Sequence, residues 1–254
     1  MVRQRTCIAE FGLSSVNLVQ LEPAFLLHSR AYRNTSMIVD LFCLHHGWIS
    51  AVAKGVKSTK SSMRNNLQAF QPLLISWYGR NELVTLTQAE IDTPFPSIKA
   101  DYLAWGFYLN ELLYRLLGKH DPQPQLFADY QNILLALCNE TASEKHLRYF
   151  ECNLLANLGY GLQLATETNT RCPLEPDTDY HYSFDHGPRR QEIKSSNPLN
   201  IFKGSSLLAL HERRLDDTQI LSDAKRLLRG AIHSLLGDRP LRSRELFRTR
   251  NVSG

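Results

Sequence analysis

The N-terminal third of the chain alternates apolar and polar positions with the period of two that is typical of β-strands. Five apolar runs separated by turn residues lie between Pro23 and Asp92: AFLLHS, TSMIVDLFCL, WISAVAK, FQPLLISWY and ELVTLTQAE. Five short strands with one long connection predict a small closed barrel, for which the OB-fold is the commonest five-stranded architecture. A fragment of a β-sandwich or an SH3-like barrel would fit this pattern nearly as well, because the sequence does not give the strand order.

After Pro94 and Pro96 the apolar positions take the period of helices. Three helical segments are predicted, at residues 97–120, 123–138 and 143–161. Gly159 is a suitable residue to end the third of them. The stretch 166–200 is poor in periodicity and rich in Pro, Asp, Thr and Asn, so it is expected to be irregular or short-stranded. Helical periodicity returns at residues 205–213 and 216–237, and a short turn follows at 241–248.

These patterns predict an α+β protein with several parts. With 43% hydrophobic residues among 254, the chain can bury the cores that such parts need. The predicted parts are an irregular leader, expected to be disordered, at residues 1–20, an OB-fold domain at 21–96, a helical domain at 97–162, and a C-terminal irregular and helical module packed on it at 163–254.

Positive charge is concentrated in the sequence. Residues 225–250 hold eight Lys or Arg against Asp238 and Glu245, although the formal net charge of the whole chain is only +4. A second segment, residues 41–81, contains no Asp or Glu. Local clusters of one sign say more about possible partners than the total does.

The cysteines and the apolar runs bear on the compartment. Five cysteines without a CxxC pair are not typical of a disulfide framework in a chain of 254 residues, and they fit a reducing cytoplasm. No apolar run approaches the length of a membrane span, and the first twenty residues lack the pattern of a signal peptide. We therefore expect a cytoplasmic protein.

Catalytic motifs are nearly absent. The sequence contains no phosphate-binding loop GxxxxGK[ST], no GxGxxG, no GxSxG and no HExxH. Two carboxylate pairs, Asp177 with Asp179 and Asp216 with Asp217, could hold Mg²⁺. The first pair is more simply a turn, and the second precedes a predicted helix, where acids cap the positive end of the dipole. We expect no enzyme and no cofactor.

A metal site is also not expected. Cys172, His181 and His186 fall within fifteen residues, but structural zinc usually takes four ligands in two closely spaced pairs. His45 and His46 are expected to form a turn before the third strand.

The segment AVAKGVKSTKSSMRNN is the strongest candidate for binding a polyanion. It contains four cations mixed with the Ser, Thr and Asn residues that hydrogen-bond phosphate oxygens: Lys54, Lys57, Lys60 and Arg64. A solvated surface loop is the plainer interpretation, and composition alone does not decide between the two. The loops and one face of OB-type barrels bind oligonucleotides, which favours contact with DNA.

Further cations of the same barrel stand beside aromatic residues. The two groups are Arg30 and Arg33 around Tyr32, and Trp77, Tyr78 and Arg80 near a turn. Such neighbours can combine base stacking with neutralisation of phosphate. In a regular strand, however, Trp77 and Tyr78 point to opposite sides, so at most one of them can stack.

The segment DRPLRSRELFR forms a second basic cluster, with Arg239, Arg242 and Arg244. A C-terminal helix whose arginines complement acidic neighbours or its own dipole is one interpretation, and contact with a polyanion is the other. Dipole complementation accounts for only one or two of the cations.

The chain resembles the bacterial RecO family of DNA repair and recombination mediators. The resemblance is carried by AFLLHSRAYRNTSMIVDLF, GWISAVAKGVKS, LQAFQPLLISWYGRNELVTLTQAE, YLNELLYRLL, LRYFECNLLANLGYG and RPLRSRELF. These blocks keep their order and spacing from about Leu21 to Arg248. Many family members carry a four-cysteine zinc knuckle in the third part; this sequence keeps only Cys172 there and so resembles the members that lack zinc.

The family resemblance implies a protein that acts without catalysis. It implies binding to single- and double-stranded DNA, annealing of complementary strands, contact with the acidic tail of single-strand-binding protein, and help in RecA loading together with RecR. It also implies association with the nucleoid. Two alternatives are a protein–protein adaptor without DNA contact and, less favoured, a nuclease that uses Asp177 or Asp216.

The resemblance assigns one residue to the contact with the tail. Arg148, in KHLRYFE, matches the position at which the family presents an arginine to the terminal carboxylate. A guanidinium fork suits a carboxylate, and a neighbouring apolar pocket would take the last phenyl ring. Leu147 adjoins it on the same match, and Lys145 is a companion one turn away. Taken alone, Arg148 is typical of a solvated helix residue.

Overall fold

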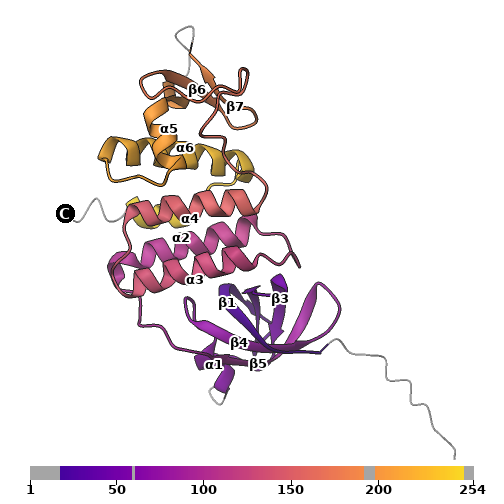
Figure 1. The fold of residues 1–254 in the computed structure, drawn as a ribbon. Helices are drawn as coiled ribbons and strands as arrows, with labels where there is room; N and C mark the ends of the chain where they lie inside the picture. Colours follow the sequence, from indigo (N-terminus) through magenta and orange to yellow (C-terminus); the bar gives the residue numbers. More distant parts are fainter. Residues whose placement is uncertain (1–17, 59–60, 192–197, 249–254) are drawn as a thin grey trace, which may run out of the picture.

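A computed structural model describes residues 18–58, 61–191 and 198–248 (Figure 1). Its first part is a closed barrel of five strands: β1 (Leu18–Tyr32), β2 (Ser36–Cys43), β3 (Gly47–Ala53), β4 (Pro72–Tyr78) and β5 (Leu83–Ile91). The strands follow the order β1-β2-β3-β5-β4, and β4 pairs again with β1. All pairs are antiparallel except β3 with β5. The OB-fold prediction is confirmed, with a short helix α1 (Ser62–Asn66) in the long connection.

The first strand is longer than its apolar run. It has 15 residues, begins at Leu18 and runs past the polar residues 28–32. One half pairs with β4 and the other with β2, and each register shifts once, between Val19 and Glu22 and between Leu26 and His28. Because β1 closes the barrel from both sides, backbone pairing rather than apolar alternation sets its length. Residues 18–20, predicted as leader, therefore belong to the barrel, and the remainder of the leader lies outside the described residues.

Helices make up the middle of the molecule and most of its last part. The middle contains α2 (Ala100–Leu116), α3 (Pro124–Cys138) and α4 (Glu144–Asn157), as predicted. Gly159 follows α4 with φ of +83°, a conformation that suits glycine. The last part contains a three-stranded sheet in the order β7-β6-β8 and three helices: β6 (Asp179–Ser183), β7 (Gly187–Arg190), β8 (Ile201–Lys203), α5 (Gly204–His211), α6 (Thr218–Leu236) and α7 (Ser243–Arg248).

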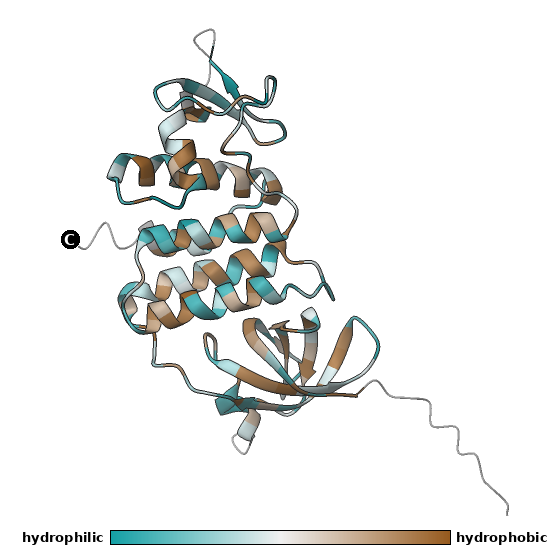
Figure 2. Ribbon diagram, viewed as in Figure 1, coloured by the Kyte–Doolittle hydropathy of each residue, from teal (hydrophilic) through white to brown (hydrophobic). Residues whose placement is uncertain are grey.

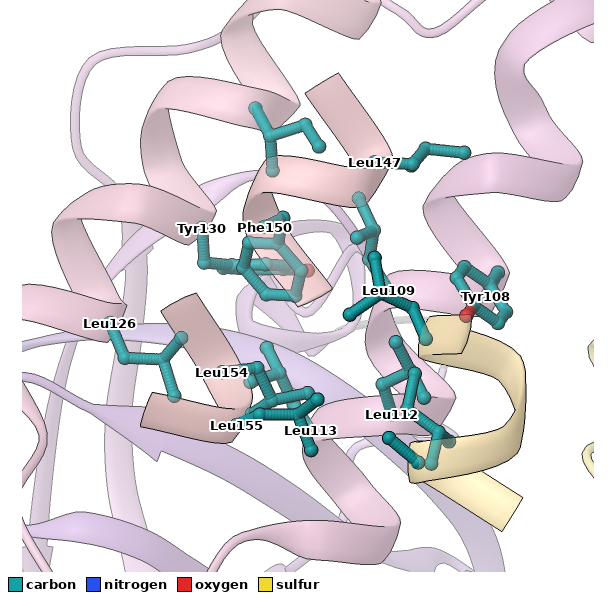
Figure 3. Close-up of a cluster of buried hydrophobic side chains, with 14 of the residues drawn as sticks. Tyr108, Leu109, Leu112, Leu113, Leu126, Tyr130, Leu147, Phe150, Leu154 and Leu155 are labelled. Atoms are coloured by element: carbon teal, nitrogen blue, oxygen red, sulfur yellow. The ribbon is translucent and has the colours of Figure 1, made fainter. Parts of the chain in front are cut away.

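Two apolar clusters hold the fold together. One fills the barrel interior, where Val39, Leu41 and Ile75 are almost completely buried. The other runs through the helices and the C-terminal part, and it includes the residues drawn in Figure 3, such as Leu109 and Leu154. Figure 2 shows brown dominating the barrel strands, whereas teal gathers at α1 and in the loops of the C-terminal sheet.

The barrel is docked on the helices through one side of its surface. Phe25 and Phe42 point away from the barrel interior and join the helical cluster. The centre of the Phe25 ring lies 5.2 Å from that of Phe127 and 5.1 Å from that of Tyr130. The Asn110 amide on α2 donates hydrogen bonds of 3.2 Å to the carbonyl oxygens of Leu26 and Leu27. This contact covers one side of the barrel.

Candidate nucleic-acid interface

The turn between β1 and β2 lies against the chain that leaves β3. The β2–β3 register ends at Met37 opposite Ala53, so the residues just beyond these positions are neighbours. The backbone N–H of Lys57 donates to the carbonyl of Thr35 at 3.0 Å, and its ammonium lies 3.5 Å from the carbonyl oxygen of Arg33. Two segments that are separate in the sequence are thereby joined into one basic surface.

Arg33 and Tyr32 form a cation–aromatic pair in this turn. The guanidinium carbon of Arg33 lies 5.2 Å from the centre of the Tyr32 ring. Arg33 has φ of +53°, a conformation that tight turns impose, and its side chain is exposed. The cation and the aromatic residue that are neighbours in the sequence therefore also lie in contact, with the Tyr32 ring half-buried.

Lys54 lies beside Tyr78 on the outer surface of the barrel. Tyr78 is 37% exposed and Trp77 only 4%, so the expected alternation at the end of β4 is confirmed and Tyr78 is the outward ring. The hydroxyl of Tyr78 meets the side chains of Thr85 and Lys54. The hydrogen bond with Thr85, followed by the nearby Lys54 ammonium, lowers the pKa of Tyr78.

We call this region the open end of the barrel, defined by five residues: Tyr32, Arg33, Lys54, Lys57 and Tyr78. Within the described part of the chain, none of its three cations forms an ion pair with a carboxylate. Arg64 is exposed in the last turn of α1, and Lys60 lies outside the described residues. Unpaired exposed cations keep their full capacity to neutralise phosphate.

Arg30 differs from these cations because a buried carboxylate already holds it. Asp40 is 1% exposed and accepts from the Arg30 guanidinium at 3.2 Å and from the Ser50 hydroxyl at 2.6 Å. His28 lies 3.4 Å from the same carboxylate. Half of the Arg30 side chain stays exposed, so it borders the open end with its charge largely compensated.

The C-terminal basic cluster is docked on α2. The Glu111 carboxylate accepts from the backbone N–H groups of Arg242 and Ser243 at 2.9 and 2.8 Å, and thereby caps α7. The Arg115 guanidinium donates to the carbonyl of Arg239 at 3.0 Å. These contacts use backbone atoms, so the exposed side chains of Arg239 and Arg242 project from the surface, while the side chain of Arg244 is not described. The helix α7 packs on α2, and Figure 1 shows α1 on the far side of the barrel from the helices.

Arg148 is buried, which corrects its interpretation as a solvated helix residue. It is 5% exposed, and its guanidinium donates to the Glu151 carboxylate at 2.6 Å. The hydroxyl of Tyr108, on α2, donates to the same carboxylate oxygen at 2.5 Å. Among the described atoms, the Arg148 Nε has no hydrogen-bond partner. The sequence signal that was missed is the i, i+3 spacing of Arg148 and Glu151 on one helix.

Leu147 and Lys145, the two residues predicted to bind the tail together with Arg148, also make contacts inside the molecule. Leu147 is 4% exposed within the helical cluster of Figure 3. The Lys145 ammonium lies 2.8 Å from the Asp216 carboxylate, and this contact raises the pKa of Lys145 and lowers that of Asp216. Binding of an acidic peptide to these three residues would therefore have to replace contacts already made inside the molecule.

The carboxylates considered for metal binding or catalysis lie at a helix start and in a turn. Asp217 caps α6 by accepting from two backbone N–H groups, as expected, and Asp177 lies in a turn before β6. Within the described residues, no three His, Cys, Asp or Glu side chains gather closely enough to hold a metal ion. None of the described helices is both long and apolar enough to cross a bilayer.

Comparison with known sequences assigns the family. The profile described as Recombination protein O N terminal matches residues 19–95, and that described as Recombination protein O C terminal matches residues 99–245. The chain belongs to the RecO family. The boundary between the two profiles falls in the linker between β5 and α2, so the barrel is one family unit and the helices with the C-terminal sheet are the other.

Similar RecO proteins cover almost the whole chain. The protein named DNA repair protein RecO in Nitrosococcus oceani is 44% identical over 239 residues, which are 92% of this chain and 97% of that protein. Proteins of the same name are 43% identical in Methylococcus capsulatus, over 91% of this chain and 94% of that one, and in Coxiella burnetii, over 90% and 98%.

Proposed function

We propose that this RecO family member is a DNA-binding mediator of repair and recombination that anneals complementary strands without catalysis. The observation that carries the proposal is the open end of the barrel, where Lys54, Lys57 and Arg33 are exposed beside two tyrosines and have no carboxylate partner among the described residues. Cations on the protein reduce the repulsion between two phosphate chains, and base pairing then supplies the driving force. The names of the relatives support a role in DNA repair.

Removal of the basic segment tests the DNA contact. In the variant with Lys54, Lys57, Lys60 and Arg64 changed to Ala, the salt slope of binding to a single strand should fall by about three units, since each phosphate contact contributes about 0.7. Between 50 and 200 mM salt, four such contacts weaken binding by roughly fifty-fold. Anisotropy of a labelled oligonucleotide measures both quantities, and an unchanged slope would remove this segment from the interface.

The chain offers a control that loses the same charge elsewhere. Four exposed cations already form ion pairs with carboxylates: Lys99, Arg190, Arg214 and Lys225. Their quadruple replacement by Ala lowers the net charge equally but should leave most of the salt slope in place. An equal loss in both variants would mean that net charge, rather than the open end, governs binding.

Annealing and loading are the activities that follow from DNA contact in this proposal. The protein should accelerate pairing of complementary strands without ATP, also when they carry single-strand-binding protein, and with RecR it should speed RecA loading. Annealing by the quadruple variant should be slowed under the same conditions. An adaptor without DNA contact would leave annealing of bare strands at the rate found without protein.

We propose further that the tail of single-strand-binding protein binds at Arg148, with Leu147 and Lys145 beside it. The support is the family match, and the burial of the Arg148–Glu151 pair means that the tail carboxylate must compete with Glu151. The double variant Arg148→Met with Glu151→Leu removes both charges together, which avoids leaving one of them buried alone. It should lose binding of an acidic peptide ending in Phe and keep DNA binding; unchanged peptide affinity would refute the assignment.

A further inference from the structure

One row of outward-facing residues runs around the barrel in continuous register. Each member lies opposite the next in a strand pair, through β1, β2, β3, β5, β4 and back to β1: Arg30, Ile38, Val52, Thr85, Tyr78 and Leu18. Neighbouring strands lie about 4.8 Å apart, so adjacent members of this row are in side-chain contact range. The row therefore forms a single strip of surface rather than six separate positions.

The two ends of this strip differ in polarity. One end has the charged Arg30, whose guanidinium is held by Asp40, followed by Ile38, which is 8% exposed. At the other end the strip is apolar and open, since Tyr78 is 37% and Leu18 is 57% exposed. A flat apolar patch on a sheet, open to water, is a surface that a partner can cover.

The charge beside this patch selects the kind of partner. Lys54 lies next to the Tyr78 hydroxyl, and the segment 41–81 that includes both has no acidic residue. Glu82 is the acid nearest to Tyr78 in the sequence, and its carboxylate lies 3.3 Å from the ammonium of Lys119. A partner that fits must offer a flat apolar face together with an anion, which is the chemistry of a nucleotide. A duplex hides its base faces in the stack, whereas a single strand exposes them.

We propose that Tyr78 is a stacking platform for an unpaired base, and that Lys54 binds the adjoining phosphate. This rests on the proposed DNA binding and adds to it a preference for single strands at this position. Thr85 fixes the tyrosine hydroxyl from the neighbouring strand, so the ring is held in place before DNA arrives. The neighbours of Tyr78 in the row, Thr85 and Val52, are half-buried, whereas Tyr78 itself is exposed.

The experiment compares two single-stranded ligands of equal length. One is an oligodeoxythymidylate, and the other has the same phosphates but abasic sites in place of bases. In the Tyr78→Ala variant, affinity for the oligodeoxythymidylate should fall by about five-fold or more at an unchanged salt slope, because stacking carries no counterion release. Affinity for the abasic strand should stay at the wild-type value, and Tyr78→Phe should resemble the wild type with both ligands.

The Lys54→Ala variant supplies the complementary result. It should lower the salt slope by about 0.7 with both ligands alike, since both carry phosphates. An equal loss for the two ligands in Tyr78→Ala, or no loss for either, would overturn the stacking role. A change in sedimentation of Tyr78→Ala without a change in oligonucleotide binding would also overturn it, because the patch would then be a contact between two copies.

These outcomes separate the inference from the function on which it rests. If the wild type fails to bind either single-stranded ligand, the proposed DNA binding itself is wrong. If the wild type binds both ligands equally and Tyr78→Ala does the same, DNA binding stands and the stacking role of Tyr78 fails.

Discussion

The helical middle and the open end of the barrel hold charge in opposite ways. In the helical middle, Arg148 is buried and faces Glu151 at 2.6 Å, so its charge is satisfied within the molecule. At the open end, Lys54 and Lys57 are exposed and form no ion pair among the described residues. A partner that binds Arg148 must therefore displace a contact made inside the molecule, whereas a partner that binds Lys54 or Lys57 displaces no ion pair among the described residues.

The largest expected effect concerns the buried pair. Changing Glu151 to Ala leaves the Arg148 guanidinium buried without its carboxylate, and this should lower the free energy of unfolding by about 3–5 kcal/mol. Urea denaturation followed by circular dichroism measures the change. The matched variant at the open end, Lys57→Ala, should stay within about 0.5 kcal/mol of the wild type.

Two results would break this comparison. Glu151→Ala with the stability of the wild type would mean that Arg148 reaches water or another partner at little cost. A large loss in Lys57→Ala would show that the open end is part of the scaffold. The double variant Arg148→Met with Glu151→Leu should recover most of the stability, since the buried charges leave together.

The next effect lies within the barrel, where Asp40 contrasts with Arg33. Asp40→Ala removes the acceptor of the buried Ser50 hydroxyl and the counter-charge of Arg30, and should cost about 1–3 kcal/mol. Arg33→Ala, in the exposed turn, should change the free energy of unfolding by less than about 0.5 kcal/mol. Thermal or urea unfolding of the two variants measures this difference. Equal losses in the free energy of unfolding for Asp40→Ala and Arg33→Ala would mean that the buried carboxylate contributes no more to stability than the exposed turn.

The sequence predicted the elements well and the surroundings of single charges poorly. The apolar runs marked the five barrel strands and the helices α2 to α6, because burial of one face imposes a period that survives in the sequence. They did not mark the short helices α1 and α7, the second of which was predicted as a turn. Asp40 was a usable signal, since it is the one charged residue within TSMIVDLFCL. That Arg30 would pair with it follows from the β1–β2 register, which places Arg30 opposite Ile38, two residues away from Asp40. The burial of Arg148 could not be predicted, because helix position alone does not reveal which face the neighbouring helices cover.

A smaller effect separates two arginines of the barrel by their DNA contacts. Arg33→Ala should lower the salt slope of single-strand binding by about 0.7, because within the described part of the chain no carboxylate pairs with Arg33. Arg30→Ala should lower the slope by clearly less, since Asp40 already compensates Arg30. Anisotropy titrations at several salt concentrations measure both slopes. A larger change for Arg30 would mean that it leaves Asp40 when DNA binds.

The smallest effect concerns surface charges that form ion pairs. They lie at the surface like the cations of the open end, and they are paired like the charges of the helical middle. In the C-terminal part, Arg190 approaches Glu175 at 2.5 Å, and its side chain is the main cause of the lowered pKa of Glu175. Glu167 is also lowered, chiefly because it accepts from the backbone N–H of Arg190, with a second hydrogen bond from Thr170. Arg190→Ala should therefore return the pKa of Glu175 toward its ordinary value and leave most of the lowering at Glu167, since the backbone donor remains.

Carbon-detected NMR titration of the two carboxyl groups measures this difference. Because both folded-state pKa values lie below the unfolded one, each group contributes stability that is fully present above the unfolded pKa and is lost as the pH falls through the folded pKa. In Arg190→Ala, the part due to Glu175 should be lost from this acid-side dependence, while the part due to Glu167 persists. Equal shifts at both carboxyls would show that the charge of the guanidinium, rather than the hydrogen bonds, sets the two pKa values. Because Glu175 is exposed and Glu167 is only partly buried, the change in stability should be the least of those predicted, and the titration midpoints are the sharper readout.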